Sequence, residues 1–138
     1  MIHEFRYIGC FLQYDELNRA LSLINRVSLS NVIKNPHITF AYRPEFVDES
    51  LFGKAIKVCI IGYTCDGKNE GVKVTLDSDN QVINKMAAQI SVPHITLSIS
   101  DDSESVLTKY LSFEMLDEPI EITGVFGGMD FNNNVIYW

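Results

Sequence analysis

The sequence predicts an α+β fold made of two similar lobes around a shared cleft. Its main support is a tetrapeptide, Pro-His-Ile-Thr, that occurs at residues 36–39 and again at 93–96. Elements of the same predicted kind surround both copies in the same order. In addition, 46% of the 138 residues are apolar, which is enough to bury the core of one compact domain. We therefore expect a single domain with lobes at about 1–65 and 66–138, between which strands can be exchanged.

Each copy of the tetrapeptide lies in an apolar run, 35–42 or 92–99, that is rich in β-branched or aromatic residues and is typical of a strand. Side chains alternate between the faces of a strand. The histidine and threonine of each copy therefore share one face, and the isoleucine between them points to the other. Proline opens both strands, where its missing N–H is tolerated.

The first half is expected to begin with a mostly apolar, central strand. A helix follows, because Leu17, Ala20, Leu21 and Ile24 have helical spacing and acidic residues occupy its first turn. The expected elements are a strand at 4–12, a helix at 15–26, the first histidine strand, a short helical segment at 48–52 and a strand at 54–64. The Asp-Gly pair within 64–71 predicts a turn between the halves.

The second half repeats this order. Ser78 or Asp79 is expected to cap a helix that ends near residue 90 and has one apolar face. The expected elements are a strand at 72–76, that helix, the second histidine strand, a helix within 101–110 and a strand at 120–126. A turn at 132–134 and a closing strand at 135–138 complete the chain.

Composition narrows the classes of function. The net charge of -7 argues against non-specific binding to long nucleic acid, which depends on clustered lysine and arginine. No run is long enough to cross a bilayer, and the N-terminus lacks a signal-peptide pattern, so we expect a cytoplasmic protein, monomeric and without membrane association. The three cysteines are odd in number and lack metal-ligand spacing, so we expect them to be reduced and to bind no metal.

The paired motifs suit displacement at phosphorus. The attacking and leaving oxygens lie on opposite sides of the phosphorus atom, so one of His37 and His94 can accept a proton while the other donates one. The hydroxyls of Thr39 and Thr96 can donate hydrogen bonds to the non-bridging oxygens, where charge develops. This chemistry needs no metal or other cofactor. The alternative is that the two strands are structural relics of an inert duplication.

With these two His-x-Thr motifs in repeated surroundings, the chain resembles the two-histidine (2H) phosphoesterase superfamily over most of its length. The resemblance implies two α/β lobes with antiparallel sheets beside a central groove, and catalysis by the two histidines. The segments 62–71 and 93–100 are most similar to the cyclic-phosphodiesterase domains of tRNA-ligase-type RNA repair proteins. Such enzymes open a 2′,3′-cyclic phosphate.

Further substrate-binding residues are predicted with competing structural roles. Arg43 shares the face of His37 and Thr39 if the strand is straight, so it can reach a phosphate or simply be solvated. Ala41 and Ser98 are expected on the same faces, where small side chains leave room for a ligand. Aromatic side chains that can stack on a nucleobase, or else pack in the core or at the rim, are Tyr14, Tyr63, Phe126 and Trp138.

The expected activity is that of a metal-independent phosphodiesterase acting on a nucleotide phosphodiester or 2′,3′-cyclic phosphate. Other branches of the resembled superfamily cleave 2′-5′ oligoadenylate, ADP-ribose cyclic phosphate or cyclic dinucleotides. The net negative charge favours a small nucleotide, or a nucleotide at the end of an RNA, over binding to folded RNA. Two alternatives stay open: a module that binds nucleotide or phosphate without cleaving it, and a cyclic phosphodiesterase for RNA-end repair.

Overall fold

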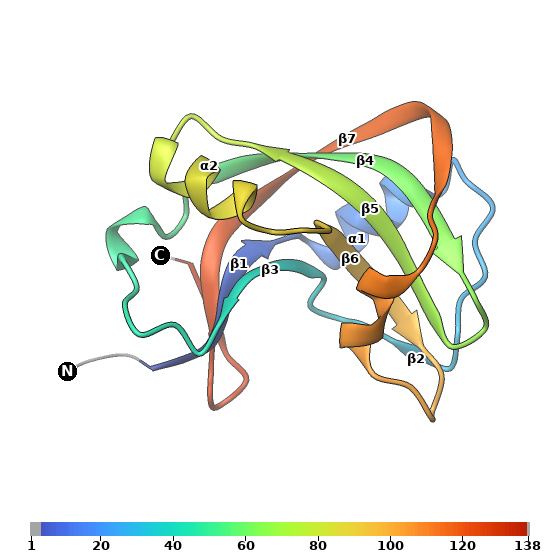
Figure 1. The fold of residues 1–138 in the computed structure, drawn as a ribbon, viewed down its shortest axis with the longest axis horizontal. Helices are drawn as coiled ribbons and strands as arrows, with labels where there is room; N and C mark the ends of the chain where they lie inside the picture. The colour runs from blue at the N-terminus through green and yellow to red at the C-terminus, as the bar shows by residue number, and fades with distance from the viewer. Residues whose placement is uncertain (1–3, 138) are drawn as a thin grey trace.

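The computed structural model describes residues 4–137, which form a mixed α+β fold dominated by one antiparallel sheet (Figure 1). Two α-helices and two short 3-10 helices interrupt the strands. In chain order the elements are β1 (Phe5–Phe11), α1 (Tyr14–Leu21), β2 (Asn31–Val32), β3 (His37–Tyr42), η1 (Glu49–Leu51), β4 (Ala55–Cys65), β5 (Asn69–Asp77), α2 (Gln81–Ala88), β6 (His94–Ile99), η2 (Ser105–Tyr110), β7 (Glu114–Asp130) and β8 (Val135–Ile136).

The strand order of the sheet is β2-β6-β5-β4-β7-β1-β3, and β8 adds to β7. Although the two histidine strands, β3 and β6, belong to opposite ends of this order, some of their Cα atoms lie within 8 Å of each other. The sheet is therefore strongly curved. In Figure 1 the long strands β4, β5 and β7 arch across the top of the view, above β3 and β6.

Strand pairing joins the two halves of the chain. The first strand of each half pairs with the histidine strand of its own half, β1 with β3 and β5 with β6. The last strand of each half pairs with the first strand of the other, β4 with β5 and β7 with β1. These last strands also pair with each other at the centre of the sheet.

One continuous apolar core lies between the sheet and the helices. Strand β4 alternates buried Ile56, Val58 and Ile60 with more exposed residues, as expected for a strand with one face covered. Leu17 and Leu21 of α1 are buried in this core, and so is Ile83 of α2. Asn80 caps α2 by accepting from the amides of residues 82 and 83.

Several expected elements differ in extent. The helix predicted at 15–26 ends at Leu21, because the amide and hydroxyl of Ser22 both donate to the carbonyl of Arg19 and close the last turn. The cap of α2 is Asn80, so the expected cap at Ser78 or Asp79 is wrong by one or two residues. Within the segment predicted as the helix 101–110, only η2 is helical, and it is a 3-10 helix.

Other strands are longer than the sequence indicates. Strand β7 covers residues 114–130 instead of 120–126, because its polar first part pairs with Gly62 and Tyr63 at the end of β4. β2 lies in a segment expected to be a connection, and it exists only through pairing with Ser98 and Ile99. Trp138, at the end of the predicted closing strand, lies outside the described residues. Within residues 4–137, the helices are too short and too polar to cross a membrane.

Candidate active site

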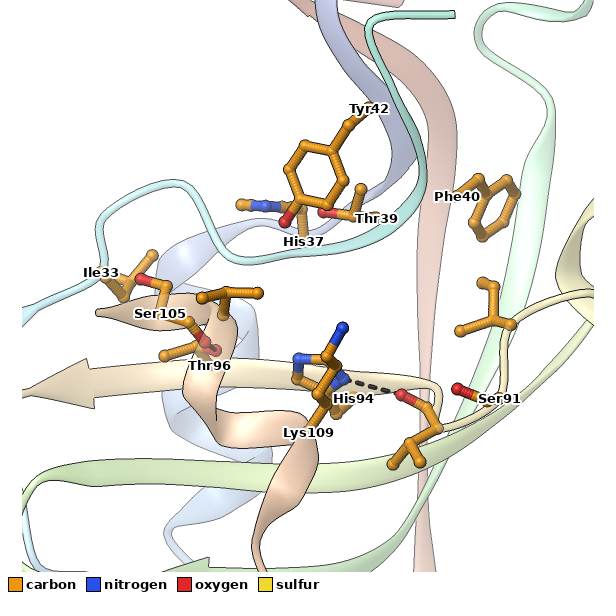
Figure 2. Close-up of a pocket in the computed structure, with 13 residues that line it drawn as sticks. Ile33, His37, Thr39, Phe40, Tyr42, Ser91, His94, Thr96, Ser105 and Lys109 are labelled. Carbon is orange, nitrogen blue, oxygen red and sulfur yellow. Dashed lines mark hydrogen bonds between the residues drawn. The ribbon is translucent and has the colours of Figure 1, made fainter. Parts of the chain in front are cut away.

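Both His-x-Thr motifs line one pocket of about 240 Å³ (Figure 2). Strand β3 contributes His37 and Thr39 to one side, and β6 contributes His94 and Thr96 to the other. The remaining wall comes from Phe40 and Tyr42 of β3, from η2, from residues 90–92 and from Ile33 in the segment before β3. The sequence thus identified four residues that the curved sheet brings together from its two ends.

The two imidazoles are held in the same way. Nδ1 of His37 lies 2.8 Å from the carbonyl oxygen of Asn35, and Nδ1 of His94 lies 2.7 Å from that of Val92. Since a carbonyl oxygen can only accept, each Nδ1 carries the hydrogen. In the neutral ring, Nε2 then has a free lone pair. In the charged ring, Nε2 can donate a proton.

The pocket lowers the pKa of both histidines below the ordinary value of 6.5. Burial is the main cause in each case, because it disfavours the charged ring, and the bond to the backbone carbonyl opposes it. The charge of His94 further lowers the pKa of His37, and the ammonium of Lys109 further lowers the pKa of His94. A charge on His94 therefore disfavours a second charge on His37.

The two threonines differ in their surroundings. Among the residues that the structure describes, Thr39 Oγ1 has no hydrogen-bond partner. Thr96 Oγ1 lies 3.2 Å from the carbonyl of Ser105 and 2.9 Å from Thr108 Oγ1. Buried Thr108 Oγ1 accepts from Asn69 Nδ2 at 3.0 Å as well as from Thr96. The single hydroxyl proton of Thr96 can therefore go to Thr108, to the Ser105 carbonyl or to a ligand.

Matching backbone features place the two motifs. The amide of Leu12 donates to the carbonyl of Pro36, and the amide of Val74 donates to that of Pro93, both at 3.0 Å. Thr39 pairs with Gly9 and Thr96 pairs with Gly71. Glycine is required at 71, because a Cβ there would collide with the Thr108 methyl group, which η2 packs against this point.

A β-bulge follows each threonine and corrects the predicted side-chain faces. On β3 the paired residues are Thr39 and Ala41, two apart, whereas their partners on β1 are adjacent, so one residue of β3 is extra. In the same way, Thr96 and Ser98 of β6 pair with adjacent residues of β5. Alternation therefore shifts by one residue. Ala41 and Ser98 do not share the histidine faces, and Ser98 is fully buried. In a strand without the bulge, Tyr42 would lie on the opposite face from His37; with the bulge, it lines the histidine pocket.

The same shift places Arg43 outside the histidine pocket. Its φ of 44° turns the chain away at the end of β3, and its guanidinium lies over the ring of Phe131, 5.8 Å from the centroid. Tyr14 also lies outside, at the start of α1, where Lys34 Nζ sits 4.6 Å from its ring centroid.

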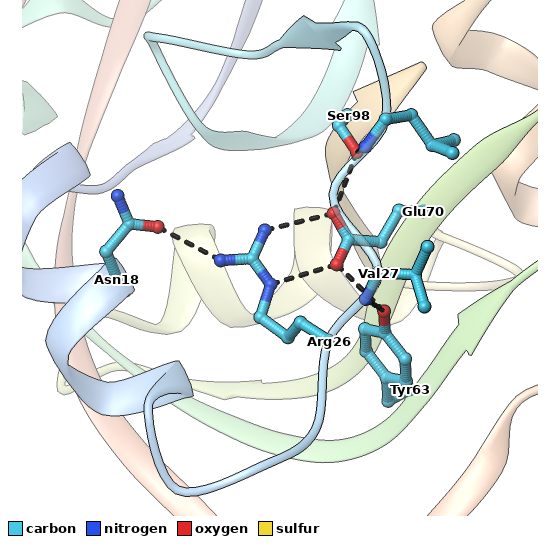
Figure 3. Close-up of polar contacts among 7 residues, drawn as sticks. Asn18, Arg26, Val27, Tyr63, Glu70 and Ser98 are labelled. Atoms are coloured by element: carbon cyan, nitrogen blue, oxygen red, sulfur yellow. Dashed lines mark hydrogen bonds and ion pairs between the residues drawn. The ribbon is translucent and has the colours of Figure 1, made fainter. Parts of the chain in front are cut away.

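Tyr63 and Phe126, which were also predicted to stack on a nucleobase, instead contact residues inside the fold. The Tyr63 hydroxyl donates to Glu70 at 2.8 Å and accepts from the amide of Val27 at 2.8 Å (Figure 3). Burial is the main cause that raises the Tyr63 pKa to about 12. Phe126 is 1% exposed and packs against the rings of Phe40 and Phe52. Trp138 is outside the described part of the chain.

Sequence reasoning did not predict the other residues that line the pocket, of which four have polar side chains: Tyr42, Ser91, Ser105 and Lys109. Lys109 and Ser105 come from η2, and Tyr42 comes from the end of β3. Figure 2 shows Lys109 beside His94, which agrees with its effect on the His94 pKa. Lys109 gives the pocket a fixed cation for an anionic ligand. No sequence signal marks Lys109, since its position depends on how η2 packs on β5 and β6.

Residues 4–137 contain no group of three or more His, Cys, Asp or Glu side chains arranged to hold a metal ion. Cys10, Cys59 and Cys65 form no disulfide within the part of the chain that the structure describes. No family model matches the chain, and no curated protein matches its sequence.

Proposed function

We propose that this protein is a metal-independent phosphodiesterase that cleaves a nucleotide phosphodiester or a 2′,3′-cyclic phosphate by paired-histidine acid and base catalysis. One observation carries the proposal. Two half-buried imidazoles from opposite ends of the sheet line one pocket, each with Nδ1 fixed by a backbone carbonyl and Nε2 left for proton transfer.

The reaction on a cyclic phosphate follows from this arrangement. Water attacks phosphorus, and Nε2 of the neutral histidine removes its proton as the new P–O bond forms. Nε2–H of the charged histidine gives its proton to the ribose oxygen as the old P–O bond breaks. Thr39, Thr96 and Lys109 stabilise the negative charge that develops on the non-bridging oxygens. The two histidines exchange protonation states, and solvent restores them.

We also propose that the chain is built as a 2H phosphoesterase, with two pseudo-symmetric lobes about a central cleft. The support is the repeated order of strand, helix, histidine strand, 3-10 helix and strand. The equivalent strand pairings, bulges and proline carbonyl contacts in the two halves add to it.

The pocket volume supports a small substrate. About 240 Å³ is below the usual range of ligand pockets, which begins at about 300 Å³, and suits a phosphodiester with roughly one nucleoside. With a net charge of -7, the rest of the surface offers little attraction to a long nucleic acid. Nucleotides and RNA ends are therefore the proposed substrates, in the cytoplasm and with the protein as a monomer.

The test is product analysis with 2′,3′-cyclic nucleotides, 2′-5′ oligomers and cyclic dinucleotides, before and after exhaustive chelation. We expect chelation to leave turnover unchanged, and His37→Ala or His94→Ala to lower it by roughly two to four powers of ten. The double variant should lose far less than the product of the single losses, because both rings act in one transfer. Binding without product would favour the non-catalytic module. Near-normal turnover by His37→Ala, or loss on chelation that a divalent metal restores, would refute the mechanism.

A further inference from the structure

A second cavity, of about 270 Å³, lies beside the histidine pocket and is lined by Arg6, Tyr7, Tyr42, Arg43 and Phe131. Tyr42 lines both cavities. Tyr7 also lies between the two cavities: its ring centroid is 4.5 Å from that of His37 and 6.0 Å from that of Tyr42. The two cavities are therefore adjacent, with Tyr42 between them.

The cavity has the chemistry to bind a nucleotide. Two arginines gather in a chain that carries an excess of seven negative charges. Among the described residues, neither guanidinium forms an ion pair with a carboxylate. Arg6 donates to the side-chain oxygen of Asn133 at 2.5 Å, and Arg43 lies over Phe131. Phe131 and Tyr42 are 49% and 65% exposed, so their rings are open to stacking.

The backbone at Arg43 is an independent observation. Its φ of 44° is in the left-handed region, which favours glycine, and the next residue is a proline, which further restricts it. Backbone strain of this kind is concentrated at functional sites. Arg43 Cζ lies 5.8 Å from the centroid of the Phe131 ring, within the range of a cation–π contact.

We propose that this cavity is a second subsite that binds the neighbouring nucleotide of the substrate, its phosphate against Arg6 and Arg43 and its base against Tyr42 and Phe131. The subsite rests on the proposed function and defines the substrate class more closely. The preferred substrate has at least two nucleotides, with the scissile phosphate in the histidine pocket.

The test compares two substrates that share the same reactive end. One is adenosine 2′,3′-cyclic phosphate, and the other is the dinucleotide ApA that ends in a 2′,3′-cyclic phosphate. We expect kcat/KM to be about tenfold higher for the dinucleotide. Arg43→Gly, which the φ of residue 43 accommodates, and Arg6→Gln should each reduce the ratio of the two kcat/KM values severalfold. Arg19→Gln removes the same charge from the exposed surface of α1 and should leave the ratio unchanged.

A binding measurement separates failure of the subsite from failure of the proposed function. The His37→Ala protein is titrated with ApA 3′-phosphate and with adenosine 3′-phosphate, with and without Arg43→Gly. Tighter binding of the dinucleotide that depends on Arg43 supports the subsite, even if no substrate is cleaved. Cleavage with equal kcat/KM for both substrates, or a ratio that Arg43→Gly and Arg6→Gln leave unchanged, would overturn the subsite while the histidine mechanism stands.

Discussion

Removing the negative charge of Glu70 should destabilise the fold more than changing any exposed ion pair. Glu70 is 0% exposed, and its carboxylate accepts four hydrogen bonds (Figure 3). Arg26 donates to its two oxygens at 2.9 and 3.0 Å, Tyr63 donates at 2.8 Å, and Ser98 donates at 2.8 Å. Every oxygen lone pair is therefore directed at a donor.

Glu70→Gln keeps the size of the side chain but turns one acceptor into a donor. Whichever way the amide is oriented, its NH₂ group faces one N–H of Arg26, and the guanidinium loses its counter-charge. Breaking a buried ion pair from one side costs about 3–5 kcal/mol. With a urea dependence of about 2 kcal/mol per molar, the unfolding midpoint should fall by roughly 2 M.

The fall in the unfolding midpoint of Glu70→Gln is measured by urea unfolding followed by circular dichroism, with Glu121→Gln as the matched control. The control pair, Lys57 and Glu121, is 4.0 Å apart with side chains 57% and 63% exposed, so it should contribute less than about 1 kcal/mol. Arg26→Gln should also be strongly destabilising, and the double variant should lose clearly less than the sum. A loss below about 1 kcal/mol for Glu70→Gln would show that water, and not Arg26, solvates the carboxylate.

Three further predictions concern the proposed activity. The value of kcat/KM should be greatest below pH 6.5 and fall as the pH rises to 8, because both histidine pKa values are lowered from 6.5 and the form with one charged ring is most populated between them. Thr39→Val should lower turnover with little change in the unfolding midpoint, whereas Thr96→Val should lower both, because Thr96 is bonded to η2. Dinucleotides and long RNAs with the same reactive end should be cleaved at similar rates that depend only mildly on salt.

These three predictions are tested by pH profiles of kcat/KM, by paired turnover and unfolding measurements, and by rates at two ionic strengths. An optimum above pH 7 would mean that the histidines are not the titrating groups. Equal destabilisation by both threonine variants would contradict the difference between their environments. A steep loss of the long-RNA rate with salt would reveal a basic track and favour RNA-end repair.

The repeated motif allowed the two histidines and two threonines of the pocket to be predicted, because these residues and their order are local properties of the chain. The identities of His37 and His94 as pocket residues needed only the duplication. The face of Arg43 was predicted wrongly, since the bulge after Thr39 depends on pairing with β1. Lys109 could not be found, because nothing local to it indicates contact with β6.

The burial of the Glu70 carboxylate was also not predicted from the sequence. Glu70 lies in the segment 64–71, whose polar composition and Asp-Gly pair predict an exposed turn. The turn itself is confirmed, with Gly67 at a φ of 90°, but β5 already begins at Asn69. The partner of Glu70, Arg26, lies 44 residues earlier, just beyond the end of α1. Only the tertiary fold brings the two together.

The exchange of β4 and β7 between the halves constrains how the chain can fold during its synthesis. β1 needs β7 as a neighbour, and β4 needs both β5 and β7. When the ribosome has released only the first 65 residues, β1 and β3 can pair, but β4 has neither of its partners. The centre of the sheet must wait for residues 114–130, so folding is slow and close to all-or-none. Until then β4 has an unpaired apolar edge, which we expect to favour aggregation of the incomplete chain.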